Sequence, residues 1–232
     1  MMPNELKALR CFPGENATPS TLLIWAALHF PARTTLSCSF SGIGGLLLSH
    51  IIYSYALDIP ILFIDTEFLF PDTYALRQLW AEKYNLNILD FRPELSPVQQ
   101  TQVYGDLLWE RNPNLCCALR KVQPMQQALA NYKIWITALR RDQSPTRNTV
   151  EVLEHRKLTT GQHIIKLNPL AHWTKQQVWA YITLHRLPYN PLLDNGYASI
   201  GCLQCTQPCT NGTNERAGRW VGHTKTECGL HT

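Results

Sequence analysis

The strongest constraint on the fold is a repeated alternation between short apolar runs and helical segments along residues 31–188. Five of the apolar runs have the length and the β-branched content of buried strands. Strands separated by helices pair in parallel and carry helices on both faces. The sequence therefore predicts an α/β fold with a doubly wound, mostly parallel sheet. The expected strands are Thr34–Phe40, Ile59–Ile64, Leu86–Phe91, Lys133–Leu139 and His163–Leu167.

Helices are expected between these runs from their apolar spacing and from residues that favour helix starts. Leu46–Leu57 is apolar along most of its length, and Asp72 is expected to cap the helix that follows it. Thr174 is expected to cap the last helix. Leu115–Leu129 also has a helical pattern, which Pro124 is expected to kink or break because proline lacks the backbone N–H.

The chain is expected to form one domain in three parts. Residues 1–30 read as a helical lead-in, and residues 31–188 form the α/β core. Residues 189–232 differ, because proline, glycine, asparagine and threonine dominate up to residue 214 and no core-forming periodicity runs through them. Something other than hydrophobic burial must order this part, and a metal centre would do so. We expect a metal- or cluster-binding loop there, followed by a mobile catalytic tail.

Composition and charge exclude several classes of function. The chain has 232 residues, of which 45% are hydrophobic and 16% charged, so it is expected to fold as a globular domain. The net charge of +4 is too diffuse for a nucleic-acid partner but suits a small anionic ligand. No apolar run approaches the length of a membrane span, and the N-terminus lacks the pattern of a signal peptide. A cytoplasmic location without a membrane partner is expected, and a homo-oligomer is left open.

The eight cysteines give the strongest chemical signal. Reduced cytosolic thiols favour metal binding or catalysis over disulfides. Cys116-Cys117 and Cys202-x-x-Cys205 together could hold zinc or an iron–sulfur cluster, or the first pair could simply be buried. Adjacent cysteines on a helix diverge, which a cubane with four iron corners tolerates better than a single ion. Cys209 could replace Cys205, but the tighter pair is favoured. Two further cysteines, Cys11 and Cys38, are expected to be structural.

Cys228 lies close to the end of the chain, outside any expected element. Its neighbours favour chemistry over an incidental position. Gly229 permits close backbone approach, and His231 can act on the thiol or its product. Nearby cations favour the thiolate, the reactive form of cysteine. A flexible tail also lets the thiol meet two reaction partners in turn. The cations are Arg216, Arg219 and Lys225.

Three polar segments follow expected strands, at the edge where ligands bind in such sheets. In Ser39–Gly45 the backbone N–H groups could cradle a phosphate, although no lysine follows the glycines as in a Walker-type loop. Asp65–Phe70 is the second segment, and Arg140–Arg147 is the third. Arg140 and Arg141 suit phosphate or sulfate, or they belong to a solvated turn. Elsewhere, Lys121 lies one helical turn after Cys117, where it could tune a cluster, reach the substrate, or remain on the surface.

Taken together, these features resemble the assimilatory adenylyl-sulfate and phosphoadenylyl-sulfate reductases, from about Leu36 to the C-terminus. The resemblance implies a fold like that of the adenine nucleotide alpha hydrolases, with a nucleotide-binding core. It is carried by many ordered stretches. They are Ile64-Asp-Thr-Glu-Phe-Leu-Phe-Pro71, Cys116-Cys-Ala-Leu-Arg-Lys-Val122, Trp135-Ile-Thr-Ala-Leu-Arg-Arg-Asp-Gln-Ser144, Leu167-Asn-Pro-Leu-Ala-His-Trp-Thr174, Leu187-Pro-Tyr-Asn-Pro191, Ile200-Gly-Cys202, Arg216-Ala-Gly-Arg-Trp220 and Glu227-Cys-Gly-Leu-His231.

The resemblance implies a role for each candidate residue. Cys228 is the expected nucleophile, and His231 is expected to assist it. Cys116, Cys117, Cys202 and Cys205 are expected to hold a [4Fe–4S] cluster. Ser39, Phe40 and Thr66 are expected at the nucleotide end. The positive positions around the substrate are expected to be Lys121, Arg140, Arg141, Arg216 and Arg219.

Members of the family with a cluster mostly use adenylyl sulfate, so that substrate is implied, with the 3′-phosphorylated form or both substrates as alternatives. The implied reaction forms a thiosulfonate on Cys228, which thioredoxin, glutaredoxin or glutathione then reduces to release sulfite, the product used in cysteine biosynthesis. The chain departs from the family at Ile43 and Gly44 in the first loop, at Glu67 in place of glycine, and at Val221 in place of tryptophan. These changes bear on nucleotide binding rather than on the cysteines.

Two other functions fit less well. An ATP pyrophosphatase that thiolates tRNA would need a Ser-Gly-Gly-Lys-Asp-Ser loop to bind ATP and magnesium, and that loop is absent from the sequence. A metal-stabilised nucleic-acid-binding module would need a basic stripe with aromatic stacking groups, which the diffuse charge does not supply.

Overall fold

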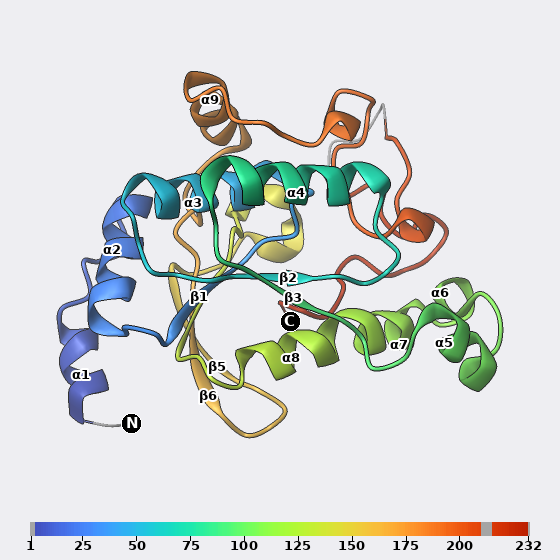
Figure 1. The fold of residues 1–232 in the computed structure, drawn as a ribbon, viewed down its shortest axis with the longest axis horizontal. Coiled ribbons are helices and arrows are strands. Elements are labelled where there is room, and N and C mark those ends of the chain that lie inside the picture. The colour runs from blue at the N-terminus through green and yellow to red at the C-terminus, as the bar shows by residue number, and fades with distance from the viewer. Residues whose placement is uncertain (1–2, 210–214, 232) are drawn as a thin grey trace.

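The computed structural model describes residues 3–209 and 215–231, which build a six-stranded sheet with helices on both faces (Figure 1). The strand order is β3-β2-β1-β4-β6-β5. All neighbouring strands pair in parallel except β5, which runs antiparallel to β6 at one edge. The predicted α/β fold with a mostly parallel sheet is therefore confirmed. The strands are β1 (Thr34–Ser37), β2 (Ile61–Ile64), β3 (Ile88–Phe91), β4 (Ile134–Ile136), β5 (Leu153–Lys157) and β6 (His163–Leu167).

The helices divide between the two faces of the sheet. One face packs against α2, α3, α4 and α9, and the other against α8. Alternation along the strands produces this division, because Ile61 and Phe63 join the first cluster whereas Leu62 joins the second. The helices are α1 (Pro3–Arg10), α2 (Pro19–His29), α3 (Ile43–Ser54), α4 (Pro71–Tyr84), α5 (Pro97–Tyr104), α6 (Leu108–Arg111), α7 (Pro113–Cys117), α8 (Gln123–Leu129) and α9 (Lys175–Leu184).

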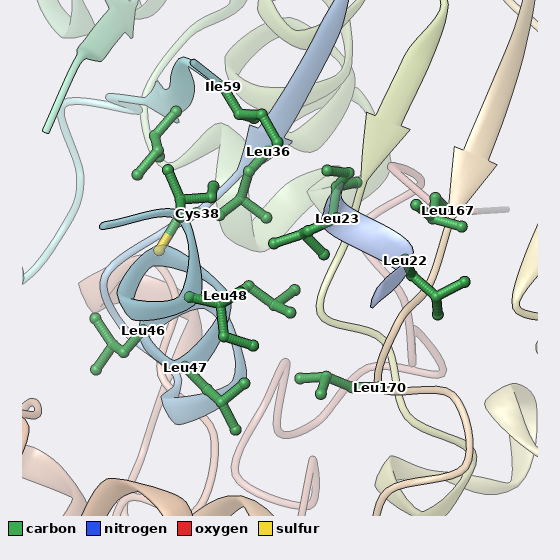
Figure 2. Packing of buried hydrophobic residues seen from close by; sticks show 14 of the residues in the cluster. Leu22, Leu23, Leu36, Cys38, Leu46, Leu47, Leu48, Ile59, Leu167 and Leu170 are labelled. Atoms are coloured by element: carbon green, nitrogen blue, oxygen red, sulfur yellow. The ribbon is translucent and has the colours of Figure 1, made fainter. Parts of the chain in front are cut away.

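The main hydrophobic core lies between the sheet and α3. Leu46, Leu47 and Leu48 are consecutive in this helix and all fully buried, because the sheet covers one side and α2 and α9 cover the others. Figure 2 shows these side chains beside Leu22 and Leu23 of α2 and Leu36 of β1 in one packed cluster. A helix that is buried on all sides reads as apolar throughout, as its sequence does.

Some local expectations change in the structure. Thr174 caps α9 as expected, with its hydroxyl accepting from the backbone N–H of Gln177 at 3.2 Å. Asp72 lies inside the first turn of α4, where Phe70 holds the capping position. Its carboxylate still suits the positive end of the helix. The edge strand β5 was not predicted, because its sequence Leu-Glu-His-Arg-Lys is polar and half-exposed.

The segment around Pro124 is one continuous helical path with an irregular centre. A π-helical turn, Ala118–Val122, joins α7 to α8. Pro124 lies in the first turn of α8, so the missing N–H coincides with the change of helix type. No helix among residues 3–209 and 215–231 is long and apolar enough to cross a membrane.

Candidate active site

A cavity of about 360 Å³ opens at the carboxyl ends of the parallel strands, where the sequence predicted a ligand to bind. The loops after β1, β2 and β4 form part of its wall, and the C-terminal segment supplies the rest. Cavities of this size hold nucleotide-sized ligands. The sequence-predicted residues that line it are Ser39, Thr66, Lys121, Arg140, Arg216, Arg219, Cys228 and His231.

The loop after β1 brings the start of α3 to the cavity. Gly42 is the capping residue, and no side chain caps the helix there. Two glycines permit the close packing of this turn: a Cβ at Gly44 would meet Cβ of Ala138 at 3.1 Å, and one at Gly45 would meet Sγ of Cys38 at 2.8 Å. The first N–H groups of a helix lack helical partners and carry partial positive charge. This end of the cavity therefore suits a polar or anionic group.

Asp65 organises the loop after β2. Its carboxylate accepts hydrogen bonds from the hydroxyl of Tyr74 at 2.6 Å and from the backbone N–H of Glu67 at 2.9 Å. These bonds fix the intervening Thr66, whose hydroxyl lies 3.3 Å from Sγ of Cys202. Thr66 therefore joins the cavity to the cysteine region of the C-terminal segment.

The four cysteines predicted as ligands line one small enclosed space. Cys116 and Cys117 come from the end of α7, whereas Cys202 and Cys205 flank a short 3₁₀ turn. No group of three or more His, Cys, Asp or Glu converges closely enough to hold a single metal ion in the part of the chain that the structure describes. Lys121 lines both this space and the larger cavity. The aromatic walls of the space are Phe68, Trp109 and Trp220.

Burial and neighbouring cations act on these thiols in opposite directions. Burial raises the pKa of Cys116 to about 12 and the pKa of Cys205 to about 11. Burial also acts to raise the pKa of Cys202, but the charge of Lys121 and a hydrogen bond with Thr66 bring that pKa below its ordinary value. Cys202 is therefore the ligand candidate best prepared to exist as a thiolate. The other thiols release their protons more readily once a metal cation binds.

Two carboxylates, Glu215 and Glu227, form ion pairs with three arginines of the cavity. The Nη2 group of Arg140 lies 3.1 Å from Glu215. Arg147 donates two hydrogen bonds to Glu227, from Nε and Nη2, each 2.8 Å long. Nη2 of Arg216 lies 3.3 Å from the same carboxylate. These ion pairs hold the loop after β4 against the C-terminal segment.

Arg219 is held differently from the other arginines. Its guanidinium lies over the ring of Trp220, with Cζ 4.6 Å from the ring centroid, and its Nη1 donates to the hydroxyl of Ser199 at 3.4 Å. It occupies the place where a Cβ would stand at position 201, so a larger residue there would displace the guanidinium. Its buried Nε has no hydrogen-bond partner within residues 3–209 and 215–231. A ligand oxygen would satisfy such a donor.

The last described residues lie below the labels of β2 and β3 and above α8 in Figure 1. Cys228 is half-buried and lines the cavity, and Leu230 packs against the second hydrophobic cluster. The ring of His231 stacks on Trp135 with 5.4 Å between centroids. Burial, followed by the charge of Lys166, holds the pKa of His231 well below its ordinary value. His231 is therefore a neutral imidazole at this position.

Two of the predicted binding residues do not line the cavity. Phe40 has a left-handed backbone, with φ of 51°, and its ring is fully buried beside Phe63. Arg141 points to the other side of its loop, where its Nε donates to the carbonyl of Val150 at 2.8 Å and its Nη1 lies 3.0 Å from Nδ1 of His172. Substrate contact by Phe40 and Arg141 therefore stays a prediction that this cavity does not support.

Known proteins resemble this chain over most of its length. Residues 35–208 match the model of the phosphoadenosine phosphosulfate reductase domain. The chain belongs to this family. A relative from Halalkalibacterium halodurans named adenosine 5′-phosphosulfate reductase is 47% identical over 209 residues, which cover 89% of this chain and 88% of that protein. One of the same name from Bacillus thuringiensis is 44% identical over 226 residues, covering 95% and 94%.

Solved structures show the same relationship. The phosphoadenylyl-sulfate reductase from Candida auris, in a phosphate complex, is 34% identical, with a TM-score of 0.72, and the match covers 83% of this chain and 91% of that one. The FMN adenylyltransferase from Candida glabrata shares the fold at 16% identity, with a TM-score of 0.59, over 97% of this chain and 76% of that one. The family resemblance predicted from the sequence motifs is thus confirmed.

Several residues of the cavity were not singled out in the sequence. Arg147 lies in the Arg140–Arg147 segment that the sequence placed at the ligand-binding edge. Its position could therefore be predicted, but its ion pair with Glu227 could not. Glu227 lies beside the cavity rather than in its wall, and it could have been noticed as the carboxylate directly before the predicted nucleophile. Glu215 and Lys175 line the cavity and pair with each other at 3.4 Å, and no local pattern marks either one.

Proposed function

We propose that this chain reduces adenosine 5′-phosphosulfate to sulfite and AMP, with Cys228 as the nucleophile. The supporting observation is that a thiol, an amino group and a buried guanidinium line one nucleotide-sized cavity, at Cys228, Lys121 and Arg219. The names of the relatives at 47% and 44% identity support the same substrate.

The proposed orientation places the nucleotide towards the start of α3 and the sulfate towards the tail. The α3 end offers glycine backbone amides and the hydroxyls of Ser39 and Thr66, which suit the phosphate and the sugar hydroxyls of the nucleotide. The positively charged side chains line the cavity together with Cys228 and His231 of the C-terminal tail. Lys121 and Arg219 would bind the sulfate oxygens, because Arg147 and Arg216 are already paired with a carboxylate.

In the first proposed step the Cys228 thiolate attacks the sulfur of the sulfate group. An S–S bond forms and the bond from sulfur to the bridging oxygen breaks, so AMP leaves with both electrons of that bond. The product on the enzyme is a thiosulfonate, Cys–S–SO₃⁻. Lys121 and Arg219 would stabilise the charge on the sulfonate oxygens through the transition state. The neutral imidazole of His231 would contact the transferring group without adding charge.

In the second proposed step an external thiol attacks Sγ of Cys228 and expels sulfite. The resulting mixed disulfide is resolved by a second thiol, so two thiols supply the two electrons and Cys228 is regenerated. Thioredoxin, glutaredoxin and glutathione are the donors expected from the sequence. The donor and the cytoplasmic location remain predictions.

We further propose that Cys116, Cys117, Cys202 and Cys205 hold a [4Fe–4S] cluster. Their thiols line one space without converging on one point, and a cubane distributes its ligands over four iron atoms whereas Zn²⁺ gathers them around one ion. When bound, the cluster would supply structural order and local electrostatics. Broad visible absorption and about four irons per chain in anaerobically purified protein would support this assignment. A colourless zinc protein would contradict it.

The decisive experiment replaces Cys228 by serine. We expect Cys228→Ser to abolish sulfite formation while adenosine 5′-phosphosulfate still binds, because a hydroxyl is far less nucleophilic than a thiolate. With ³⁵S-labelled substrate and no reductant, the wild-type protein should retain label on the peptide that contains position 228. Cys11→Ser, which changes an exposed cysteine, serves as the control and should behave as wild type. Sulfite release by Cys228→Ser near the wild-type rate would refute the proposal.

A second candidate is a reductase that accepts the 3′-phosphorylated nucleotide, alone or as well. The likeness to the phosphoadenylyl-sulfate reductase from Candida auris favours it. Anaerobic turnover of the two nucleotides, compared as kcat/KM, separates these functions. We expect a clear preference for adenosine 5′-phosphosulfate, because both closer relatives described above carry that name.

A further inference from the structure

Glu227, the residue directly before the nucleophile, is the most strongly bound side chain of the tail. Its carboxylate accepts the two Arg147 hydrogen bonds, a third from the hydroxyl of Thr146 at 3.3 Å, and the ion pair with Arg216. The side chain of Glu227 is only 11% exposed. Charge-assisted bidentate pairs of this kind are both strong and specific in direction.

Residues 224–231 form neither helix nor strand, so side-chain contacts carry much of the seating of the tail. Arg216 adds to the Glu227 contacts by donating from Nε and Nη2 to the carbonyl of Thr226, at 3.2 and 3.1 Å. Lys225 donates to the side chain of Asn114 at 2.5 Å, but that contact is exposed and therefore weak. The contacts of Arg147 and Arg216 fall on the two residues directly before Cys228, and those with the Glu227 carboxylate are the more buried.

We propose that Glu227 is the positioning residue that seats the catalytic thiol, through its ion pairs with Arg147 and Arg216. This inference rests on the proposed function of Cys228. One side chain fixes the backbone next to the nucleophile, and both of its cationic partners also line the cavity. The position of Cys228 thereby depends on a pair of guanidinium groups in the wall of the substrate cavity.

The ion pairs of Glu227 must break before a protein reductant can reach Cys228 in the second step of the reaction. Sγ of Cys228 belongs to the wall of the substrate cavity, which is too small to admit a folded thiol donor. A protein donor therefore reaches the thiosulfonate only after the tail leaves its seat. The ion pairs of Glu227 determine how often the tail moves away from the cavity. Stronger pairs favour attack on the substrate, and weaker pairs favour access of the reductant to Cys228.

The test compares Glu227→Gln with Glu94→Gln in the full-length protein as purified under anaerobic conditions. Glu94 is exposed and lies outside the cavity, so its variant controls for the loss of one negative charge. Two rates are measured by mass spectrometry without substrate: alkylation of Cys228 by iodoacetamide, and tryptic cleavage after Lys225. For Glu227→Gln we expect both rates to rise about tenfold or more, because a charge-assisted hydrogen bond shifts an equilibrium by at least that factor.

Unchanged alkylation and cleavage in Glu227→Gln would overturn the proposal. Faster alkylation without faster cleavage would also overturn it, because that pattern reports only a change in the reactivity of the thiol. Glu227→Asp keeps the charge but shortens the reach, so both of its rates should lie between those of the wild type and Glu227→Gln. Neither measurement requires turnover, so the seat can be confirmed even if the Cys228→Ser experiment refutes the reductase function.

Discussion

The buried side chains of the sheet and those of the C-terminal segment differ in kind. In the sheet and its helices, residues such as Leu36 and Leu47 are fully buried among other aliphatic side chains. In the segment after residue 188, the buried groups include Cys202, Thr206 and Arg219. The first region gains stability from removing apolar surface from water. The second depends on thiols, ion pairs and hydrogen bonds that need specific partners.

This difference shows which region fixes the positions of its side chains more strictly. A hydrophobic core tolerates changes that keep volume and pattern, because its contacts are non-directional. A polar segment has few acceptable arrangements, since each buried donor or charge requires its own partner. The scaffold and the reacting groups are thus stabilised separately, and variants should be able to damage one while sparing the other.

The largest expected effect is the loss of the proposed [4Fe–4S] cluster through Cys202→Ser. We expect this variant to lose its visible absorption and its sulfite formation, because a serine hydroxyl replaces a thiolate ligand that Lys121 and Thr66 stabilise. Tryptic cleavage within residues 189–231 should accelerate, while the circular dichroism of the sheet and helices stays near wild type. The matched control is Cys209→Ser, which does not line the space of the four cysteines and should keep the absorption. Collapse of the whole fold in Cys202→Ser would show that the two regions are not independent.

A smaller effect, confined to stability, is expected from Leu47→Ala in α3. Truncating this fully buried side chain should lower the free energy of unfolding by about 3 kcal/mol, because it removes apolar contact and leaves a cavity. Anaerobic urea unfolding followed by circular dichroism measures the change. Leu184→Ala changes a leucine that is 77% exposed and should have little effect. Equal losses in the two variants would contradict the packing described for the core.

The last effect appears only at alkaline pH, and it tests Lys166, a buried lysine of β6 that lines a pocket together with His231. Burial lowers the pKa of Lys166 from 10.5 to about 8, although Glu154 acts against this shift. Between these two values the folded protein binds fewer protons than the unfolded chain, so the free energy of unfolding should rise with pH. We expect the difference between wild type and Lys166→Met to change by up to about 3 kcal/mol over this range, at about 1.4 kcal/mol per pH unit. Parallel pH profiles of the two proteins would show that the amine is not buried in this way.

The contrast between the regions also explains what the sequence could predict. Short apolar runs indicated β2 and β6 because burial on both faces leaves a local pattern. The edge strand β5 was missed because its half-exposed polar residues leave none. The four candidate ligand cysteines and Cys228 stood out through residue type and spacing. The four line the small enclosed space, and Cys228 lines the large cavity. The pairing of Arg147 with Glu227 joins residues 80 positions apart, and no local periodicity encodes such a contact.

The π-helical turn at Ala118–Val122 makes the number of residues in this helix important for the site. One residue turns an α-helix by about 100°, so the additional residue of a π turn sets which side of the helix each later position faces. Cys117 before the turn lines the space of the four thiols, Met125 after it lines the substrate cavity, and Lys121 lines both. A single-residue deletion here would rotate the cysteine pair away from the lysine while leaving every functional side chain in the sequence. Activity is therefore expected to depend on the number of residues between Cys117 and Met125 as well as on their identity.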